Sequence, residues 1–250
     1  MLNAKKPGLL FLHVPKTGGS SIMYGLRRHY LFSWYNIRAA ASLFAAKAVS
    51  GDLEGIEVSD EQIQRIRIPL VLYSAGQETK YIYGHVWYDS NFELLRSRGY
   101  LLMTCLRNPV NRFFSHFLWN RYKTTSHDRT SLTFEKFLEN PSTGPLGSQY
   151  IRYMGGIRED GNYISQQAID TAVKNCSSMD ILGHLEDLEG LKGQIREKLH
   201  FNLKLGHEKS SPAPVEEAKR IRESRQLRSE VERICQPDLE FYHRIRKVPA

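Results

Sequence analysis

A short polar loop with the sequence PKTGGSS follows an apolar stretch near the beginning of the chain. It combines a lysine, Lys16, with hydroxyl side chains and two adjacent glycines, Gly18 and Gly19. Glycines allow the backbone to close around an anion, and the free N–H groups at a helix N-terminus favour negative charge. If a helix begins in this loop, the loop is predicted to bind a phosphate or sulfate group, with hydroxyl donors from Thr17, Ser20 and Ser21.

The position of the lysine distinguishes this loop from the common ATP-binding loop. That motif, G-x-x-x-x-G-K-[ST], has its lysine after the glycines and a hydroxyl group on a magnesium ion. Here Lys16 precedes both glycines. We therefore expect a smaller terminal anionic group, with the ammonium close to a bridging or leaving oxygen.

A second basic motif, RNPVNRFFSHF, begins at Arg107 after another apolar stretch. Its Asn-Pro pair is typical of a helix start, and Arg112 and Ser115 are three residues apart, as neighbours on a helix are. Arginine offers a planar fork of donors that matches phosphate, and a serine hydroxyl adds one more donor. The motif predicts a second phosphate site; the alternative is a capped amphipathic helix with surface arginines.

Two separated anion sites predict a ligand with two anionic groups, such as 3′-phosphoadenosine 5′-phosphosulfate. Its adenine needs an apolar slot, for which Trp119 and Phe117 are candidates. The polar loop over 202–214 contains Lys209 and Ser210, which are candidate nucleotide ligands or else part of a solvated loop.

A histidine between the two motifs, His85 in the segment YGHVWY, is the candidate general base. A neutral imidazole suits that role because its unperturbed pKa is about 6.5. The alternative is a strand-end histidine that is satisfied by a backbone carbonyl. His13, at the end of the first apolar stretch, is interpreted as structural.

The segments around both motifs predict alternating strands and helices. The continuous apolar runs at 8–14 and 100–107 are typical of buried parallel strands, and helices are expected to follow each of them over 19–29 and 109–122. Further strands are expected at 68–74, 81–86 and 179–183. Further helices are expected over 34–67, 91–98, 133–139, 148–154, 165–176 and 187–200, and from 215 onward with a break near Pro237. This alternation predicts an α/β fold with a mostly parallel sheet, in which ligands bind beyond the carboxyl ends of the strands.

Composition is that of an ordinary globular protein. The 250 residues are 41% hydrophobic and 25% charged, and 35 Lys and Arg against 27 Asp and Glu give a formal net charge of +8. A basic balance favours anionic partners, but the absence of a long basic run argues against a nucleic-acid partner. We expect a single domain over 1–250, with a helical C-terminal segment from about 215, no membrane span and an open oligomeric state.

The three cysteines lie far apart in the sequence, at Cys105, Cys176 and Cys235. Their number and spacing argue against a disulfide framework or a structural zinc site and favour a reducing compartment. We expect a cytoplasmic location; a trimmed luminal domain of a membrane-anchored enzyme is the alternative.

Taken together, PKTGGSS and RNPVNRFFSHF resemble the two cofactor-binding motifs of sulfotransferases. The similarity is to the group of heparan sulfate 2-O-sulfotransferases and their bacterial relatives. These proteins carry PKT-small-small-[ST] after the first strand and R-[DN]-P-x-x-R-x-x-S-x-[FYW] later. The resemblance includes Tyr83–Tyr88 and extends more faintly to Asp180–Leu191 and Asp238–Tyr242.

This resemblance implies a P-loop-type three-layer α/β fold and transfer of a sulfuryl group from 3′-phosphoadenosine 5′-phosphosulfate to the hydroxyl group of a glycan or small molecule, without a metal. The 5′-phosphosulfate would be held by Lys16, Thr17, Gly18, Gly19, Ser20 and Ser21, and the 3′-phosphate by Arg107 and Ser115. The product would be 3′,5′-bisphosphoadenosine. A histidine at the position of His85 acts as base in that family, whereas Tyr83 stands where the family has another histidine.

Two other functions compete with sulfuryl transfer. A small-molecule kinase needs the lysine after the glycines and a magnesium ligand, and neither is evident in the sequence. A non-catalytic protein that binds nucleotides or acidic glycans explains the net charge, but not the leading Lys16 or His85.

Overall fold

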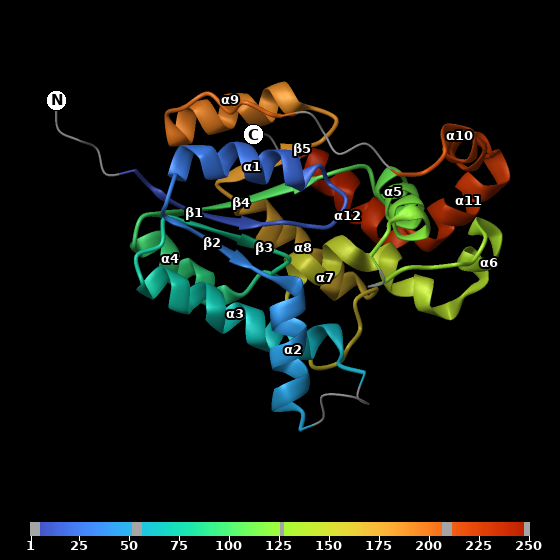
Figure 1. Cartoon of the computed structure of the whole chain (residues 1–250), viewed down its shortest axis with the longest axis horizontal. Coiled ribbons are helices and arrows are strands. Elements are labelled where there is room, and N and C mark those ends of the chain that lie inside the picture. The colour runs from blue at the N-terminus through green and yellow to red at the C-terminus, as the bar shows by residue number, and fades with distance from the viewer. Residues whose placement is uncertain (1–5, 52–56, 126–127, 207–211, 248–250) are drawn as a thin grey trace.

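The computed structural model describes residues 6–51, 57–125, 128–206 and 212–247, and a parallel β-sheet lies at its centre (Figure 1). The five strands, in the order β2-β3-β1-β4-β5, are all parallel. Their bounds are Gly8–Leu12 for β1, Trp34–Ile37 for β2, Tyr81–Gly84 for β3, Tyr100–Leu106 for β4 and Ile181–His184 for β5. The expectation of an α/β fold with a mostly parallel sheet is confirmed.

Helices cover both faces of this sheet. Their bounds are Gly19–Tyr30 for α1, Ala39–Val49 for α2, Asp60–Gly76 for α3, Glu93–Ser97 for α4, Pro109–Tyr122 for α5, Phe134–Glu139 for α6, Gln149–Gly155 for α7, Gln166–Ser177 for α8, Leu188–Leu199 for α9, Val215–Glu223 for α10, Arg225–Ile234 for α11 and Gln236–Lys247 for α12. Helices α1 and α9 lie on one face, and α3, α4 and α8 lie on the other (Figure 1). A third group, formed by α5, α6, α10 and α11, has an apolar core of its own beside the sheet.

The central strand β1 shows why the sheet is buried on both sides. Successive side chains of a strand point to opposite faces. Leu10 and Leu12 join the apolar core under α3 and α4, whereas Leu9 and Phe11 join the core under α1 and α9. All five residues of β1 are buried, as the continuous apolar run predicts.

Two of the expected elements are wrong. The segment 68–74, expected to be a strand from its β-branched and aromatic residues, is the second half of helix α3. This helix starts at a capping box between Ser59 and Gln62, and its Ile68 and Val71 pack against the sheet, so tertiary contacts override the local propensity. The segment 34–37, included in an expected helical region, is the short edge strand β2.

Because all strands are parallel, the loops after their carboxyl ends meet at one edge of the sheet. The PKTGGSS loop follows β1, His85 follows β3, Arg107 follows β4, and Leu185 follows β5. The fold thus brings both motifs and the candidate base to the same edge. Among the described residues, no helix is long and apolar enough to cross a lipid bilayer.

Candidate active site at the carboxyl edge of the sheet

The PKTGGSS loop ends in a left-handed turn that starts helix α1. Gly18 is the residue before the helix and has a φ of 75°. A Cβ atom there would lie 2.4 Å from Cδ1 of Leu185, so both the backbone angle and the close packing favour glycine. No side chain caps the helix, and its first turn has no acidic residue. The first N–H groups of α1 are therefore suited to bind an anion.

The three hydroxyl groups of the loop have different roles. Thr17 is fully buried, and its Oγ1 donates a 2.9 Å hydrogen bond to the carbonyl oxygen of Val14. Its hydroxyl holds the turn together in this structure, and the expected contact of Thr17 with an anion stays a prediction. Ser20 is exposed and Ser21 half-buried, and neither has a hydrogen-bond partner among the described residues. The hydroxyl groups of these two serines are therefore available to donate hydrogen bonds.

Lys16 lies in a strongly positive environment. Its φ is 70°, and its Nζ lies 4.1 Å from the centre of the Trp119 ring. No carboxylate pairs with this ammonium within the described part of the chain. Burial, followed by the charges of Arg107 and Lys123, lowers the pKa of Lys16 to about 8. An anion bound beside Lys16 would relieve both effects.

Arg107, at the end of β4, contacts the first motif directly. One guanidinium nitrogen donates a 3.3 Å hydrogen bond to the carbonyl oxygen of Lys16. The Arg107 backbone is held by the buried Tyr150, whose hydroxyl accepts from its N–H at 2.9 Å and donates to its carbonyl at 2.6 Å. The N–H of Tyr150 in turn donates to Asp238 of α12 at 2.9 Å. Three distant segments thus fix the end of β4.

Ser115 and Trp119 lie four residues apart on α5, and side chains at this spacing share one helix face. Ser115 is half-buried, and because Trp119 contacts the ammonium of Lys16, this face of α5 borders the first motif. Phe117, a candidate for the adenine slot, instead lies in the apolar core of the third helix group, so this expectation is wrong. Trp119, which contacts Lys16, remains a candidate for the adenine slot.

Arg112 has a structural role, in contrast to its predicted role as a phosphate ligand. Its side chain is fully buried, and its guanidinium donates to the carbonyl oxygen of Leu146 and, at 3.1 Å, to Gln149. It lies 3.9 Å from the buried carboxylate of Asp238. Helix α5 is oriented so that Arg112 faces the protein interior, while Ser115, about 60° further around the helix, does not.

His85 is held in one tautomer by its contacts. Its Nδ1 lies 2.8 Å from the carbonyl oxygen of His13. A carbonyl oxygen only accepts hydrogen bonds, so Nδ1 carries the hydrogen, and Nε2 of the neutral ring keeps a free lone pair. Burial and the charges of Arg67 and Lys16 lower the pKa of His85, although its hydrogen bond to His13 raises it. Near pH 7, Nε2 is therefore able to accept a proton.

Hydrogen bonds from helix α3 hold the backbone of His85 in place. Its carbonyl oxygen accepts hydrogen bonds from Arg67 at 2.7 Å and from Gln64 at 3.2 Å. Gln64 also accepts from the N–H of Trp87 at 3.0 Å. Sequence patterns did not indicate Arg67 and Gln64, because these residues act through long-range contacts and belong to no motif.

His13 connects the loop to His85. The centres of the two imidazole rings lie 4.6 Å apart. A Cβ atom on Gly19 would lie 1.9 Å from Nε2 of His13, so the missing side chain at Gly19 leaves room for this ring. Burial, followed by the charges of His85 and Lys16, lowers the pKa of His13 well below its usual value. Two neutral histidines therefore lie side by side next to the PKTGGSS loop.

Lys209 and Ser210, the remaining candidate nucleotide ligands, lie outside the described residues. Within the described part of the chain, no group of three or more His, Cys, Asp or Glu side chains is arranged to hold a metal ion. The three cysteines are free and buried. No family model matches this sequence, and no curated protein is significantly similar to it.

Proposed function

We propose that this protein is a sulfotransferase with a P-loop-type fold, which transfers a sulfuryl group from 3′-phosphoadenosine 5′-phosphosulfate to an acceptor hydroxyl group. The observation that carries the proposal is the hydrogen bond from Nδ1 of His85 to the carbonyl oxygen of His13. It leaves a neutral, proton-accepting Nε2 beside a cationic anion-binding loop. A site that only binds nucleotides has no use for a base in this position.

The residues at the sheet edge fit this donor. The free N–H groups of α1, together with Lys16, suit the 5′-phosphosulfate, because no acidic side chain of the first turn competes for them. Arg107 and Ser115 suit the 3′-phosphate from the neighbouring strand β4 and helix α5. When bound, the donor supplies the sulfuryl group and a phosphate leaving group.

Each residue then has a defined role in the transfer. Nε2 of His85 accepts the proton of the acceptor hydroxyl group, and the hydrogen bond to His13 orients the resulting imidazolium. Lys16 exchanges its contact with Trp119 for the negative charge that develops on the leaving oxygen. The cation–π contact it gives up is worth only about 0.5–2 kcal/mol, which makes the exchange feasible.

Thermal unfolding with 3′,5′-bisphosphoadenosine tests the proposal. With EDTA present, this product is expected to stabilise the protein by about 2.7 kcal/mol at one hundred times its Kd. Lys16→Ala should weaken the effect, and the control Lys136→Ala, at an exposed lysine on α6, should not. Stabilisation by ATP with magnesium, and none by bisphosphoadenosine, would contradict the proposal and indicate a kinase.

Transfer of labelled sulfate from the donor to a panel of glycans, lipids and small alcohols tests catalysis itself. His85→Asn is expected to abolish transfer while binding of bisphosphoadenosine persists. The matched control is His243→Asn, at an exposed histidine of α12. Full activity of His85→Asn at pH 7 would show that the base lies elsewhere.

A further inference from the structure

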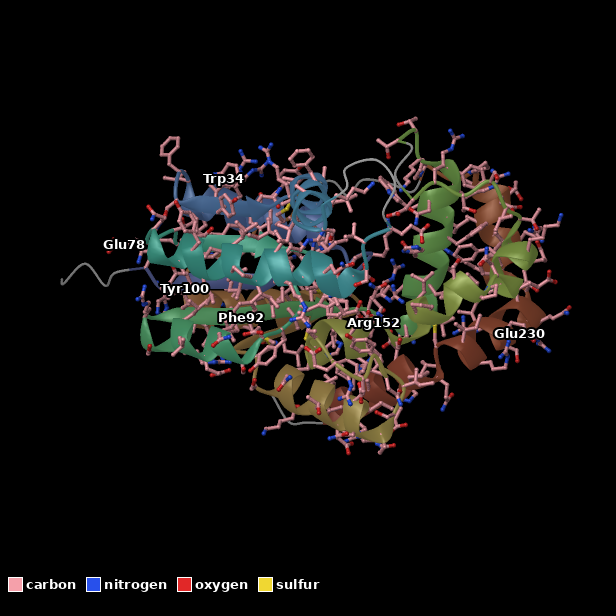
Figure 2. The ribbon with its side chains drawn as sticks, turned by 90° about the horizontal axis from the view of Figure 1, so that it is seen from below. Trp34, Glu78, Phe92, Tyr100, Arg152 and Glu230 are labelled. Carbon is pink, nitrogen blue, oxygen red and sulfur yellow. The ribbon has the colours of Figure 1, made fainter. Side chains whose placement is uncertain are left out.

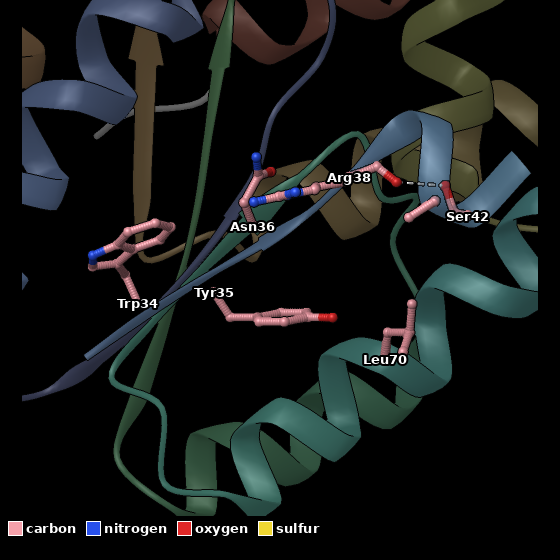
Figure 3. Close-up of a pocket in the computed structure, with 7 residues that line it drawn as sticks. Trp34, Tyr35, Asn36, Arg38, Ser42 and Leu70 are labelled. Carbon is pink, nitrogen blue, oxygen red and sulfur yellow. Dashed lines mark hydrogen bonds between the residues drawn. The ribbon is translucent and has the colours of Figure 1, made fainter. Parts of the chain in front are cut away.

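A pocket of about 450 Å³ lies along the free edge of strand β2 (Figure 3). Its walls come from β2, the start of α2 and the middle of α3, and consist of Trp34, Tyr35, Asn36, Arg38, Ala41, Ser42 and Leu70. This volume is in the range of pockets that bind small molecules. We call it the β2-edge pocket.

The β2-edge pocket is adjacent to the candidate base. Ile37 is in register with Gly84, so Arg38 and His85 leave neighbouring strands at the same edge of the sheet. Neighbouring strands are about 4.8 Å apart. Arg67 adds a direct connection, because it donates to Ser42 of the pocket wall at 2.8 Å and to the carbonyl oxygen of His85 at 2.7 Å.

The pocket has an apolar end and a polar end. Trp34, Tyr35 and Leu70 supply carbon surface, and Figure 3 shows Arg38 running back along the strand toward Asn36 on the other side of Tyr35. The guanidinium of Arg38 has no carboxylate partner among the described residues. The pocket therefore combines an aromatic wall with one positive charge beside Asn36, and the strand end next to His85 lies beyond that charge.

Exposed aromatic side chains also occur on the helices that line the pocket and just before β2. Phe44 of α2 is 63% exposed, Tyr73 of α3 is 67% exposed, and Phe32, just before β2, is 98% exposed. The aromatic and aliphatic wall of the pocket favours a ligand with an apolar body over a uniformly hydrated one.

A second hollow, of about 310 Å³, lies at the amino ends of the strands, where Figure 2 labels Glu78 and Tyr100. Its walls are Ala75, Glu78, Lys80, Arg98 and Tyr100. The loops that carry Lys16, His85 and Arg107 follow the opposite ends of the strands. This hollow provides control positions with similar side chains far from the site.

We propose that the β2-edge pocket binds the acceptor, and that the acceptor is an aromatic or cyclic alcohol with one anionic substituent. The apolar body lies against Tyr35 and Leu70, the anionic group pairs with Arg38, and the hydroxyl group reaches the sheet edge at His85. The inference rests on the proposed function, because the pocket is assigned through its distance from the base of that reaction.

Calorimetric titration with two probes, 6-hydroxy-2-naphthoate and 2-naphthol, tests this assignment in protein saturated with 3′,5′-bisphosphoadenosine. Arg38→Ala is expected to weaken the naphthoate about tenfold or more and to change 2-naphthol little, because it removes one charge-assisted contact. Arg98→Ala, in the hollow at the amino ends of the strands, is the matched control and should change neither.

A second pair of variants tests the volume of the pocket. Ala41→Leu adds bulk to the wall formed by α2 and is expected to weaken binding of both probes about tenfold. Ala40→Leu changes the preceding residue of the helix, which is not part of the wall, and should leave binding unchanged. If the unsubstituted protein binds neither probe, the proposed acceptor class is wrong.

Two results separate this inference from the proposed function. If Arg38→Ala and Ala41→Leu leave probe binding and sulfate transfer unchanged while bisphosphoadenosine still stabilises the protein, the acceptor binds elsewhere and the sulfotransferase proposal stands. If bisphosphoadenosine does not stabilise the protein, the proposed function is wrong, and so is an acceptor role for the pocket. Transfer to an acidic polysaccharide with no effect of either variant also contradicts the inference.

Discussion

Lys16 and Arg112 are both basic residues of the two motifs, yet their surroundings are opposite. Arg112 is fully buried and has a carboxylate, Asp238, and a backbone carbonyl to neutralise and bind it. Lys16 has neither within the described part of the chain; its neighbours are an aromatic ring and two further cations, and its pKa falls to about 8. The surroundings of Lys16 are therefore unfavourable for positive charge in the absence of an anion. Arg112, by contrast, has a buried carboxylate nearby and two hydrogen-bond acceptors, and only its Nε lacks a hydrogen-bond partner among the described residues.

This difference separates Arg112, which packs inside the fold, from Lys16, which we propose binds the ligand. A buried charge that loses its partner destabilises the folded state. A cation without a carboxylate partner contributes little to the stability of the folded state. We therefore expect that removal of the Lys16 side chain reduces activity and leaves the fold intact. Variants at the two positions are expected to give opposite results in stability and activity measurements.

The largest expected effect on stability is that of Arg112→Met. The substitution leaves the carboxylate of Asp238 buried beside backbone N–H groups alone, and the free energy of unfolding is expected to fall by roughly 3–5 kcal/mol. Urea denaturation measures the change. Adding Asp238→Asn should recover part of it, because the uncompensated charge is removed. A loss of stability below about 1 kcal/mol, combined with weaker binding of bisphosphoadenosine, would indicate that Arg112 binds the ligand.

Lys16→Ala is expected to have the opposite result. The value of kcat should fall about 10²–10³-fold, as expected when a group that stabilises developing negative charge is removed. The free energy of unfolding should change by less than about 1 kcal/mol, because the side chain loses only its contact with Trp119. Steady-state kinetics and urea denaturation of the same preparation give both values. A large loss of stability would mean that Lys16, like Arg112, serves the fold.

The pH dependence of kcat/KM is expected to distinguish the roles of His85 and Lys16. His85 must be neutral to act as a base; its pKa is lowered, so activity should decline only below about pH 6.5. Lys16 must be charged to bind the anion; its pKa is about 8, so kcat/KM should decline again above about pH 8. A bound anion raises the pKa of Lys16, which should move the alkaline decline of kcat upward.

The variant Lys16→Ala serves as the control for this profile. Its residual activity should lack the alkaline decline and keep the acid one. An alkaline decline that is unchanged in this variant would assign it to another group. An acid decline centred above pH 6.5 would contradict the neutral His85 that burial and the neighbouring cations imply.

The parts of the site that the sequence predicted are those in which neighbours in sequence are also neighbours in space. The loop after β1 and the start of α5 are short segments whose strand, turn and helix signals lie next to one another. The loop and the start of α5 lie at the same edge because both follow strands of a parallel sheet. Fold class and the edge of the sheet that carries the site were therefore accessible from local patterns.

The residues that hold His85 and Tyr150 in place could not be predicted from local sequence patterns. Arg67 and Gln64 reach His85 from a helix whose second half was expected to be a strand, and Asp238 reaches Tyr150 across 88 positions. The helical spacing of Arg112 and Ser115 fixes their angle about the axis of α5, but not which of them faces the interior. That orientation depends on the packing of α12 and α7, which no local pattern specifies.

The smallest expected effect is that of Ser115→Ala. The hydroxyl of Ser115 has no hydrogen-bond partner among the described residues, so its loss should leave the free energy of unfolding unchanged. If its hydroxyl donates to the 3′-phosphate, the Kd for bisphosphoadenosine should rise about fivefold, as for the loss of one hydrogen bond of about 1 kcal/mol. Adenosine 5′-phosphate, which lacks the 3′-phosphate, should bind both proteins equally. The exposed Ser177, on α8, is the matched control as Ser177→Ala. An unchanged Kd would place the 3′-phosphate away from α5, and that helix would then serve the fold through Arg112 rather than the ligand through Ser115.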